Sequence, residues 1–190
     1  MRFVLAALAL LFATPAFAGA DDPWTIDPAK SRIEFNASQV GKLITGRVRS
    51  WSATILLNPA NLAAARIDIR MDMKSATANS KDIDDLMLGK DFLDAANAPE
   101  ARFASDSVAA KGGDRYEARG KLTMRGVTRD AALPFTLQIR DDGAASNAMA
   151  RGKLEIRRLD YGIGRNEWAG TSHVADEITI EIGVAASRPK

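Results

Sequence analysis

Alternation of apolar and polar residues is the dominant pattern in this 190-residue chain. From Arg66 to Lys74 every odd position is apolar and every even position is charged. Because successive side chains of a β-strand point to opposite faces, such a run predicts a strand with one buried face and one wet face. Runs of this kind, some less regular than others, cover residues 32–37, 51–58, 66–74, 101–108, 116–125, 131–140, 148–156 and 178–184.

Turn residues separate the runs and predict an antiparallel meander. Asn58-Pro59, Lys111–Asp114 and Asp141–Gly143 are combinations that favour tight turns. One helical segment interrupts the strands, because Ile83, Leu86 and Met87 are spaced like one face of a helix that Ser80 can cap and Gly89 can end. We therefore expect one all-β domain, residues 21–190, with one short helical insertion.

A sheet with a single apolar face can hide it in a two-sheet sandwich or inside a barrel. Gly46, Gly120 and Gly152 fall on the apolar register, where small residues relieve curvature or leave space, and this favours the barrel. The inward positions are then candidate ligand contacts in a lumen. They are Phe35, Val48, Ile67, Ile69, Met71, Met73, Phe103, Leu122, Met124, Phe135, Leu137 and Leu154.

The N-terminus has the three parts of a secretory signal peptide. Arg2 precedes an apolar run over residues 3–13, and Ala16 and Ala18 form a small-x-small cleavage site. Eleven apolar residues are too few to cross a hydrocarbon core of about 30 Å. We expect residues 1–18 to be removed, with cleavage after Ala20 as the alternative, and the mature protein to be periplasmic.

Composition excludes several kinds of chemistry. The chain has no cysteine, so disulfides, thiolate nucleophiles and cysteine-ligated metals are excluded, and the single histidine, His173, cannot form a multi-histidine zinc site. The 26 basic and 24 acidic side chains leave a formal net charge of +2, which is weak evidence for a nucleic-acid partner. We expect no metal, no cofactor and no nucleic acid.

Candidate catalytic groups have simpler explanations. His173 has no companion histidine, and Asp82, Asp84 and Asp85 are expected to be solvated charges that complement a helix dipole. Gly162–Gly164 lacks the third glycine of a dinucleotide fingerprint. These residues predict no catalytic constellation.

Six ordered segments resemble the YceI-like family, and together they cover the mature chain. They are Trp24–Phe35, Gly46–Trp51, Asp91–Phe103, Gly120–Thr128, Arg158–Gly164 and Glu167–Thr171. The resemblance implies an eight-stranded lipocalin-like barrel whose lumen binds a polyisoprenoid lipid, such as an isoprenoid quinone. Two departures matter, since Lys30 and Val40 stand where the family often has histidine, so no role of those histidines can be carried over.

The resemblance therefore predicts a non-catalytic carrier of an amphiphilic lipid, with transient contact to inner-membrane proteins and an open question about its oligomeric state. The glycine-rich connection after Ile156 holds the expected mouth residues, which could instead only fix that connection. They are Arg158, Tyr161, Asn166 and Trp168.

Two rival functions remain open. A barrel packed shut by Phe35, Phe103 and Phe135 would be a structural or interaction module. An enzyme acting on a lipid would need at least two polar groups to converge on the mouth. The candidates for that role are Asp160, Glu167 and His173.

Overall fold

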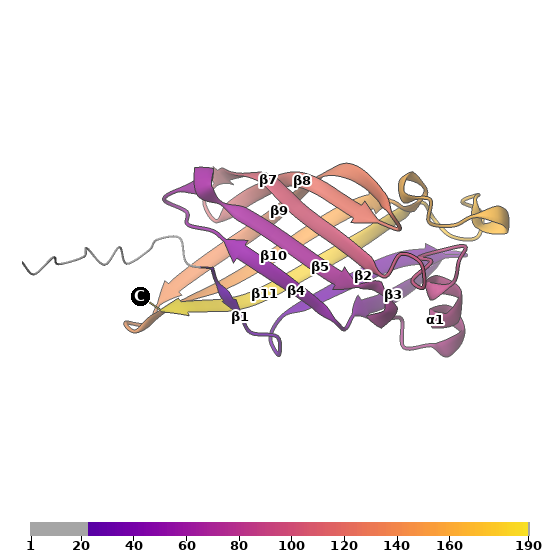
Figure 1. Ribbon diagram of the computed structural model, residues 1–190, viewed down its shortest axis with the longest axis horizontal. Coiled ribbons are helices and arrows are strands. Elements are labelled where there is room, and N and C mark those ends of the chain that lie inside the picture. Colours follow the sequence, from indigo (N-terminus) through magenta and orange to yellow (C-terminus); the bar gives the residue numbers. More distant parts are fainter. Residues whose placement is uncertain (1–22, 190) are drawn as a thin grey trace, which may run out of the picture.

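The computed structural model describes residues 23–189, which form antiparallel strands with one α-helix (Figure 1). The strands are β1 (Thr25–Ile26), β2 (Arg32–Gln39), β3 (Lys42–Val48), β4 (Trp51–Leu56), β5 (Arg66–Asp72), β6 (Ala76–Thr77), β7 (Glu100–Gly112), β8 (Arg115–Met124), β9 (Val127–Asp141), β10 (Ala145–Arg157) and β11 (Glu177–Pro189). The helix α1 covers Lys81–Leu88, and the 3-10 turns are η1 (Leu62–Ala64), η2 (Met73–Ser75), η3 (Arg158–Tyr161) and η4 (Asn166–Trp168). The expected signal peptide lies outside the described residues.

All described strands belong to one sheet, and every pairing in it is antiparallel. The order is β4-β5-β7-β8-β9-β10-β11-β2-β3-β6, and β1 pairs with β11 beyond the end of β2. The all-β prediction with one helix is confirmed. A single sheet also excludes the sandwich alternative.

The count of eight strands that the resemblance implies was too low, because β1, β3 and β6 are additional strands within the described residues. In β3 the inward positions Ile44, Gly46 and Val48 include a glycine, while Leu43 is apolar and faces outward. This mixture hides the alternation that marks the other strands. Two-residue strands such as β1 and β6 are too short to carry any period.

The sheet curls strongly, and close backbone approaches at glycines accompany the curl. A Cβ on Gly120 would lie 2.0 Å from the carbonyl oxygen of Ala104, opposite a bulge between Ser105 and Ser107. The two ends of the strand order are linked by the chain itself. After β5, near one end, the chain passes through η2 into β6, which pairs with β3 at the other end. The N–H of Trp24 beside β1 donates to the carbonyl of Ile55 in β4 at 2.9 Å. The curl directs the apolar face inward around one core.

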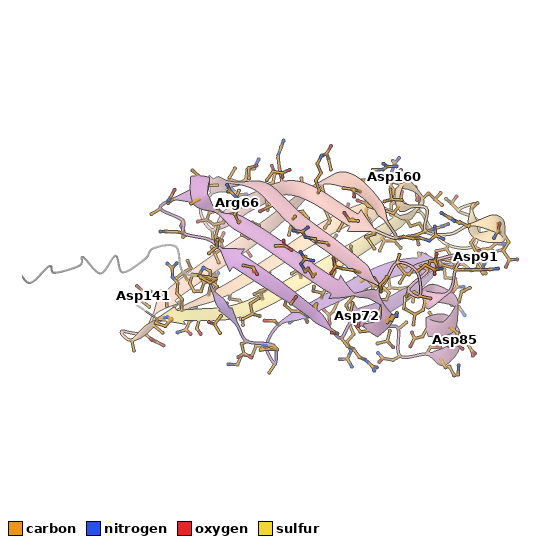
Figure 2. The ribbon with its side chains drawn as sticks, in the orientation of Figure 1. Arg66, Asp72, Asp85, Asp91, Asp141 and Asp160 are labelled. Atoms are coloured by element: carbon orange, nitrogen blue, oxygen red, sulfur yellow. The ribbon has the colours of Figure 1, made fainter. Side chains whose placement is uncertain are left out.

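The two ends of the curled sheet differ. One end carries α1 and the long connection between β10 and β11, and the C-terminus of the chain lies at the other (Figure 1). Asp85 and Asp91 mark the first end and Asp141 the second in Figure 2. None of the helices within residues 23–189 has the length and apolar character needed to cross a bilayer.

The start of α1 corrects one expectation. Ser80 occupies the N-cap position, but its side chain makes no capping hydrogen bond in the described structure. Asp84 accepts hydrogen bonds from the hydroxyl of Thr77 and the N–H of Ala78, both at 2.6 Å. The prediction that Asp84 is a solvated first-turn charge was therefore wrong, since it fixes the chain leading from β6 into the helix.

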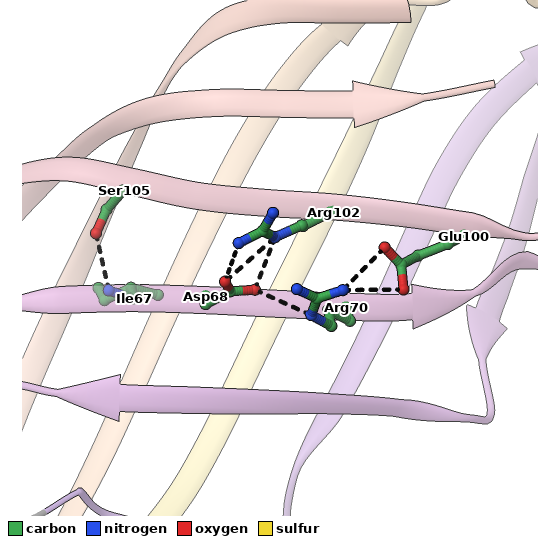
Figure 3. A network of polar contacts seen from close by, with 6 residues as sticks. All are labelled: Ile67, Asp68, Arg70, Glu100, Arg102 and Ser105. Atoms are coloured by element: carbon green, nitrogen blue, oxygen red, sulfur yellow. Dashed lines mark hydrogen bonds and ion pairs between the residues drawn. The ribbon is translucent and has the colours of Figure 1, made fainter. Parts of the chain in front are cut away.

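On the outer face, a polar network joins β5 to β7 (Figure 3). The guanidinium of Arg102 donates to both carboxylate oxygens of Asp68. Arg70 lies 3.6 Å from the same carboxylate and 3.3 Å from that of Glu100. The hydrogen bond from Arg102 lowers the pKa of Asp68 below its ordinary value of 3.8.

This lowered pKa predicts a pH-dependent contribution to stability. A carboxylate whose pKa is lower in the folded than in the unfolded state stabilises the protein at any pH above its unfolded-state pKa. This contribution is lost as the pH falls through its folded-state pKa. Asp68→Asn should therefore lower the free energy of unfolding by about 0.2–1 kcal/mol at neutral pH. The difference in unfolding free energy between the parent protein and the variant should shrink as the pH falls below 3.8, and urea unfolding at a series of pH values measures it. Asp106→Asn, an exposed position on β7, serves as the control, and a deficit independent of pH would contradict the explanation.

Candidate functional site: an apolar lumen

A cavity of about 140 Å³ lies inside the sheet at the α1 end. All of its lining residues are apolar except Glu34, Gln39 and Arg158. The apolar members from the strands and from η2 are Ile33, Phe35, Ala37, Ile44, Val48, Met71, Met73, Ala76, Met124, Ile156, Ile178 and Ile180. Such a space can hold an apolar guest but offers few hydrogen-bonding partners.

Helix α1 supplies one wall of this cavity. Ile83, Leu86 and Met87 line it from the helix, and Phe92 and Leu93 line it from the segment that follows. The sequence predicted the helix from the spacing of the first three residues, but spacing alone does not show what the apolar face contacts. These wall residues were therefore missed as candidate site residues.

A second cavity of about 60 Å³ lies toward the chain termini. The indole of Trp24 borders this cavity, and its Nε1 donates to the carbonyl of Leu57 at 2.9 Å. The guanidinium of Arg188 lies 4.5 Å from the centre of the Trp24 ring, within cation–π range. These contacts hold Trp24 in the wall of the smaller cavity.

A layer of packed side chains separates the two cavities. Phe103, Leu122 and Leu154 are buried, and none of them lines either cavity. Phe103 pairs across strands with Ile69, which borders the smaller cavity. Leu154 comes two residues before Ile156, which borders the larger cavity. The lumen is therefore divided rather than continuous.

The structure places all twelve predicted lumen residues inside the sheet, with Phe35 half-buried and the others buried. The larger cavity is bordered by Phe35, Val48, Met71, Met73 and Met124. The smaller cavity is bordered by Ile67, Ile69, Phe135 and Leu137. The remaining three form the dividing layer.

The connection between β10 and β11 is built around the guanidinium of Arg158, which is 1% exposed. Its nitrogens donate five hydrogen bonds of 2.7–3.0 Å to backbone carbonyls. Burial lowers the pKa of Arg158, and the nearby charge of Asp176 opposes that effect. The acceptors are Ile163, Trp168, Gly170, Val174 and Ala175.

The other three expected mouth residues hold the same connection in place and do not border the larger cavity. Tyr161 is buried, which raises its pKa. The Nδ2 of Asn166 donates to the carboxylate of Asp91 at 2.8 Å, and the Trp168 ring lies 5.4 Å from that of Phe92. These contacts tie the connection to the segment after α1, so Arg158 is the one mouth candidate that borders the cavity.

The candidate catalytic groups do not meet at the lumen. Asp160, Glu167 and His173 border neither cavity, and His173 instead lies edge-on to Trp168 with ring centres 6.2 Å apart. Within residues 23–189 no group of three or more metal-ligating side chains is placed to hold an ion.

The fold and the lumen define a class, namely a curled antiparallel β-sheet protein with an internal apolar cavity. A family model described as the YceI-like domain matches residues 24–186, and the chain belongs to this family. Among its relatives, a UPF0312 protein of Vibrio vulnificus is 30% identical over 181 residues, which is 92% of this chain and 93% of the relative. One from Shewanella oneidensis is 28% identical over 176 residues, covering 91% of this chain and 92% of the relative.

Solved structures are similar over most of the chain. BcnA of Burkholderia cenocepacia superimposes with a TM-score of 0.77 at 32% identity, covering 85% of this chain and 99% of BcnA. A polyisoprenoid binding domain from Saccharophagus degradans superimposes with a TM-score of 0.61 at 13% identity, covering 87% of this chain and 98% of that domain. The second likeness shows the fold alone.

The buried guanidinium predicts a large and local effect of mutation. Arg158→Met should lower the free energy of unfolding by about 3 kcal/mol or more, because five backbone carbonyls lose their donor and two of these hydrogen bonds are buried. The backbone amides of residues 163–175 should then exchange hydrogen for deuterium faster, as measured by mass spectrometry. The matched control is Arg157→Met, since Arg157 is the exposed neighbour. Equal stability of the two variants would contradict the role assigned to Arg158.

Proposed function

We propose that this protein is a non-catalytic periplasmic carrier that holds a polyisoprenoid lipid or an isoprenoid quinone in the lumen of a lipocalin-like barrel. The observation that carries the proposal is the larger cavity, an apolar space inside the core beneath α1. The polyisoprenoid binding domain with a similar fold supports the class of ligand.

The cavity volume constrains how such a lipid enters. An engineered protein cavity of about 150 Å³ admits benzene, so the larger cavity of about 140 Å³ suits roughly one isoprene unit. A longer tail must displace side chains. Met71, Met73, Met87 and Met124 border the cavity, and methionine repacks readily because it is unbranched and polarizable. We propose that the tail extends by moving these side chains and the dividing layer.

A lipid has little hydrophobic reason to leave a membrane for this lumen. Burial of each CH₂ is worth about 0.8 kcal/mol relative to water, but a bilayer offers the same gain. Capture then depends on packing and on polar contacts near the opening. Gln39 lies on the inward register at the end of β2 and is the polar residue best placed to meet a quinone carbonyl or a headgroup.

The periplasmic location rests on the N-terminal sequence. The basic start, the apolar run over residues 3–13 and the Ala16-x-Ala18 site support export with cleavage after Ala18 or Ala20. A carrier in that compartment would meet inner-membrane proteins transiently while loading or delivering its lipid.

The rival functions fit the lumen less well. A filled barrel would leave no cavity between Phe35 and α1, where one of about 140 Å³ lies. The rival enzyme would need at least two of Asp160, Glu167 and His173 at that cavity, and all three lie elsewhere.

Filling the larger cavity should abolish binding. Ala37→Trp places an indole at an inward position that lines the cavity, whereas Thr45→Trp places it on the exposed outer face of the neighbouring strand. Native mass spectrometry with a ubiquinone carrying two isoprene units should show a bound complex for the parent protein and the Thr45 variant. The complex should be absent for the Ala37 variant, and equal binding by the two variants would refute binding in this cavity.

Thinning the dividing layer should change the preferred chain length. Phe103→Ala should lower the free energy of unfolding by about 3–5 kcal/mol. It should also shift binding toward quinones with longer tails, because space opens between the two cavities. Competition between short and long quinones measures the shift. The control is Val108→Ala, a buried apolar position on the same strand that lines neither cavity. An unchanged length preference in both variants would show that the lumen does not extend past Phe103.

A further inference from the structure

Two large apolar side chains stand exposed at the tip of the β2–β3 hairpin. Val40 is 70% exposed and Leu43 is 69% exposed. Among the described residues the next most exposed large apolar side chain is Met149 on β10, at 40%. The tip therefore concentrates apolar surface in water at one end of the molecule.

The backbone holds this tip at a conformational cost. Val40 has φ of 48°, a left-handed conformation that is unusual for a β-branched residue and common for asparagine. The N–H of Val40 donates to the carbonyl of His173 at 2.8 Å, and the N–H of Ala175 donates to the carbonyl of Ser38 at 2.9 Å. An exposed valine in a strained turn gains little from packing, so its apolar side chain needs an explanation outside the folded chain.

The tip adjoins the larger cavity. The inward side chains of the same hairpin, Ala37, Gln39 and Ile44, line that cavity. The segment that anchors the tip contains His173, whose ring lies 6.2 Å from that of Trp168. Trp168 in turn packs on the cavity residue Phe92. The tip is therefore hydrogen-bonded to a segment whose histidine ring lies beside Trp168, and Trp168 packs on the cavity wall.

The charge at the tip indicates what covers it. Lys42 lies between Val40 and Leu43 and is exposed. A lysine can keep its ammonium at the level of anionic headgroups while neighbouring apolar side chains enter the acyl boundary. Tryptophan is also common at the interface between membrane and water.

We infer that the β2–β3 hairpin tip docks on a lipid bilayer, with Val40 and Leu43 entering the boundary between headgroups and acyl chains. The cavity rim then faces the membrane, which provides a route for a lipid to enter. This route rests on the proposed carrier function, whereas the docking itself is tested separately.

The absence of cysteine makes a site-specific test direct. An environment-sensitive fluorophore is attached at Leu43→Cys, and in a second protein at Met149→Cys, which lies on the outer face of β10 near the chain termini. Vesicles of phosphatidylethanolamine with a minority of phosphatidylglycerol should shift the emission of the first label to the blue and leave the second unchanged. No shift at Leu43, or equal shifts at both, would overturn the inference. If raising the protein concentration alone, without vesicles, shifts the emission at Leu43, a second copy of the chain covers the tip and the inference is overturned.

A second pair of variants separates docking from folding. Leu43→Ser should reduce partition onto the same vesicles about tenfold, equivalent to about 1.4 kcal/mol. Val40→Asn should also reduce partition while raising the melting temperature, because asparagine adopts the left-handed conformation more easily. Met149→Ser should leave partition unchanged. Unchanged partition in both tip variants would overturn the inference.

Binding of N-phenyl-1-naphthylamine from buffer without vesicles distinguishes the two proposals. If the dye binds the parent protein but the emission of the label at Leu43→Cys does not change with vesicles, the carrier function stands and docking is refuted. If the dye does not bind but the tip label still shifts, docking stands and the apolar binding function fails.

Discussion

The guanidinium of Arg158 is the interaction on which the α1 end of the molecule depends. A buried charge requires hydrogen-bond partners, and here five backbone carbonyls supply them. The segment that receives two of these bonds, at Val174 and Ala175, pairs through its other groups with the β2–β3 hairpin. The N–H groups of Gly164 and Arg165 in the same connection donate to the carbonyl of Asp91 after α1. One side chain thus links the hairpin, the connection and the helix segment around the larger cavity.

The curled sheet leaves space at its α1 end because strands alone do not fill it. Toward the middle, Phe103 and Leu122 are paired across β7 and β8, and both are buried, as is Leu154 on β10. Toward α1, the wall is completed by a helix of eight residues and by irregular segments rather than by more strand pairs. A helix packed over the end of a sheet contacts it through a few side chains, so the space beneath it is the part of the core that can open most easily to a guest.

Much of the fold could be predicted from the sequence, because strict alternation has one structural meaning. The run at 66–74 ended two residues early, where the carboxylate of Asp72 accepts from the N–H of Lys74 and turns the chain into η2. The inward register correctly placed Met71 and Phe135 inside, but it could not show that Phe103 divides the lumen, since one period describes both cavity and core. The role of Arg158 was left open between mouth and support. A single sequence does not reveal that backbone carbonyls converge on one side chain.

A carrier that competes with a membrane works close to thermodynamic balance, since its lumen and the bilayer are both apolar. The rate of exchange is then set by the passage of the lipid through the polar interface rather than by the depth of the lumen. Under the two proposals, exposed Val40 and Leu43 beside the cavity would shorten that passage, and flexible methionines along its wall would lower the cost of admitting a tail. The proposed carrier would need no reactive groups at the lumen, because its work would be to provide a second apolar environment within reach of the first.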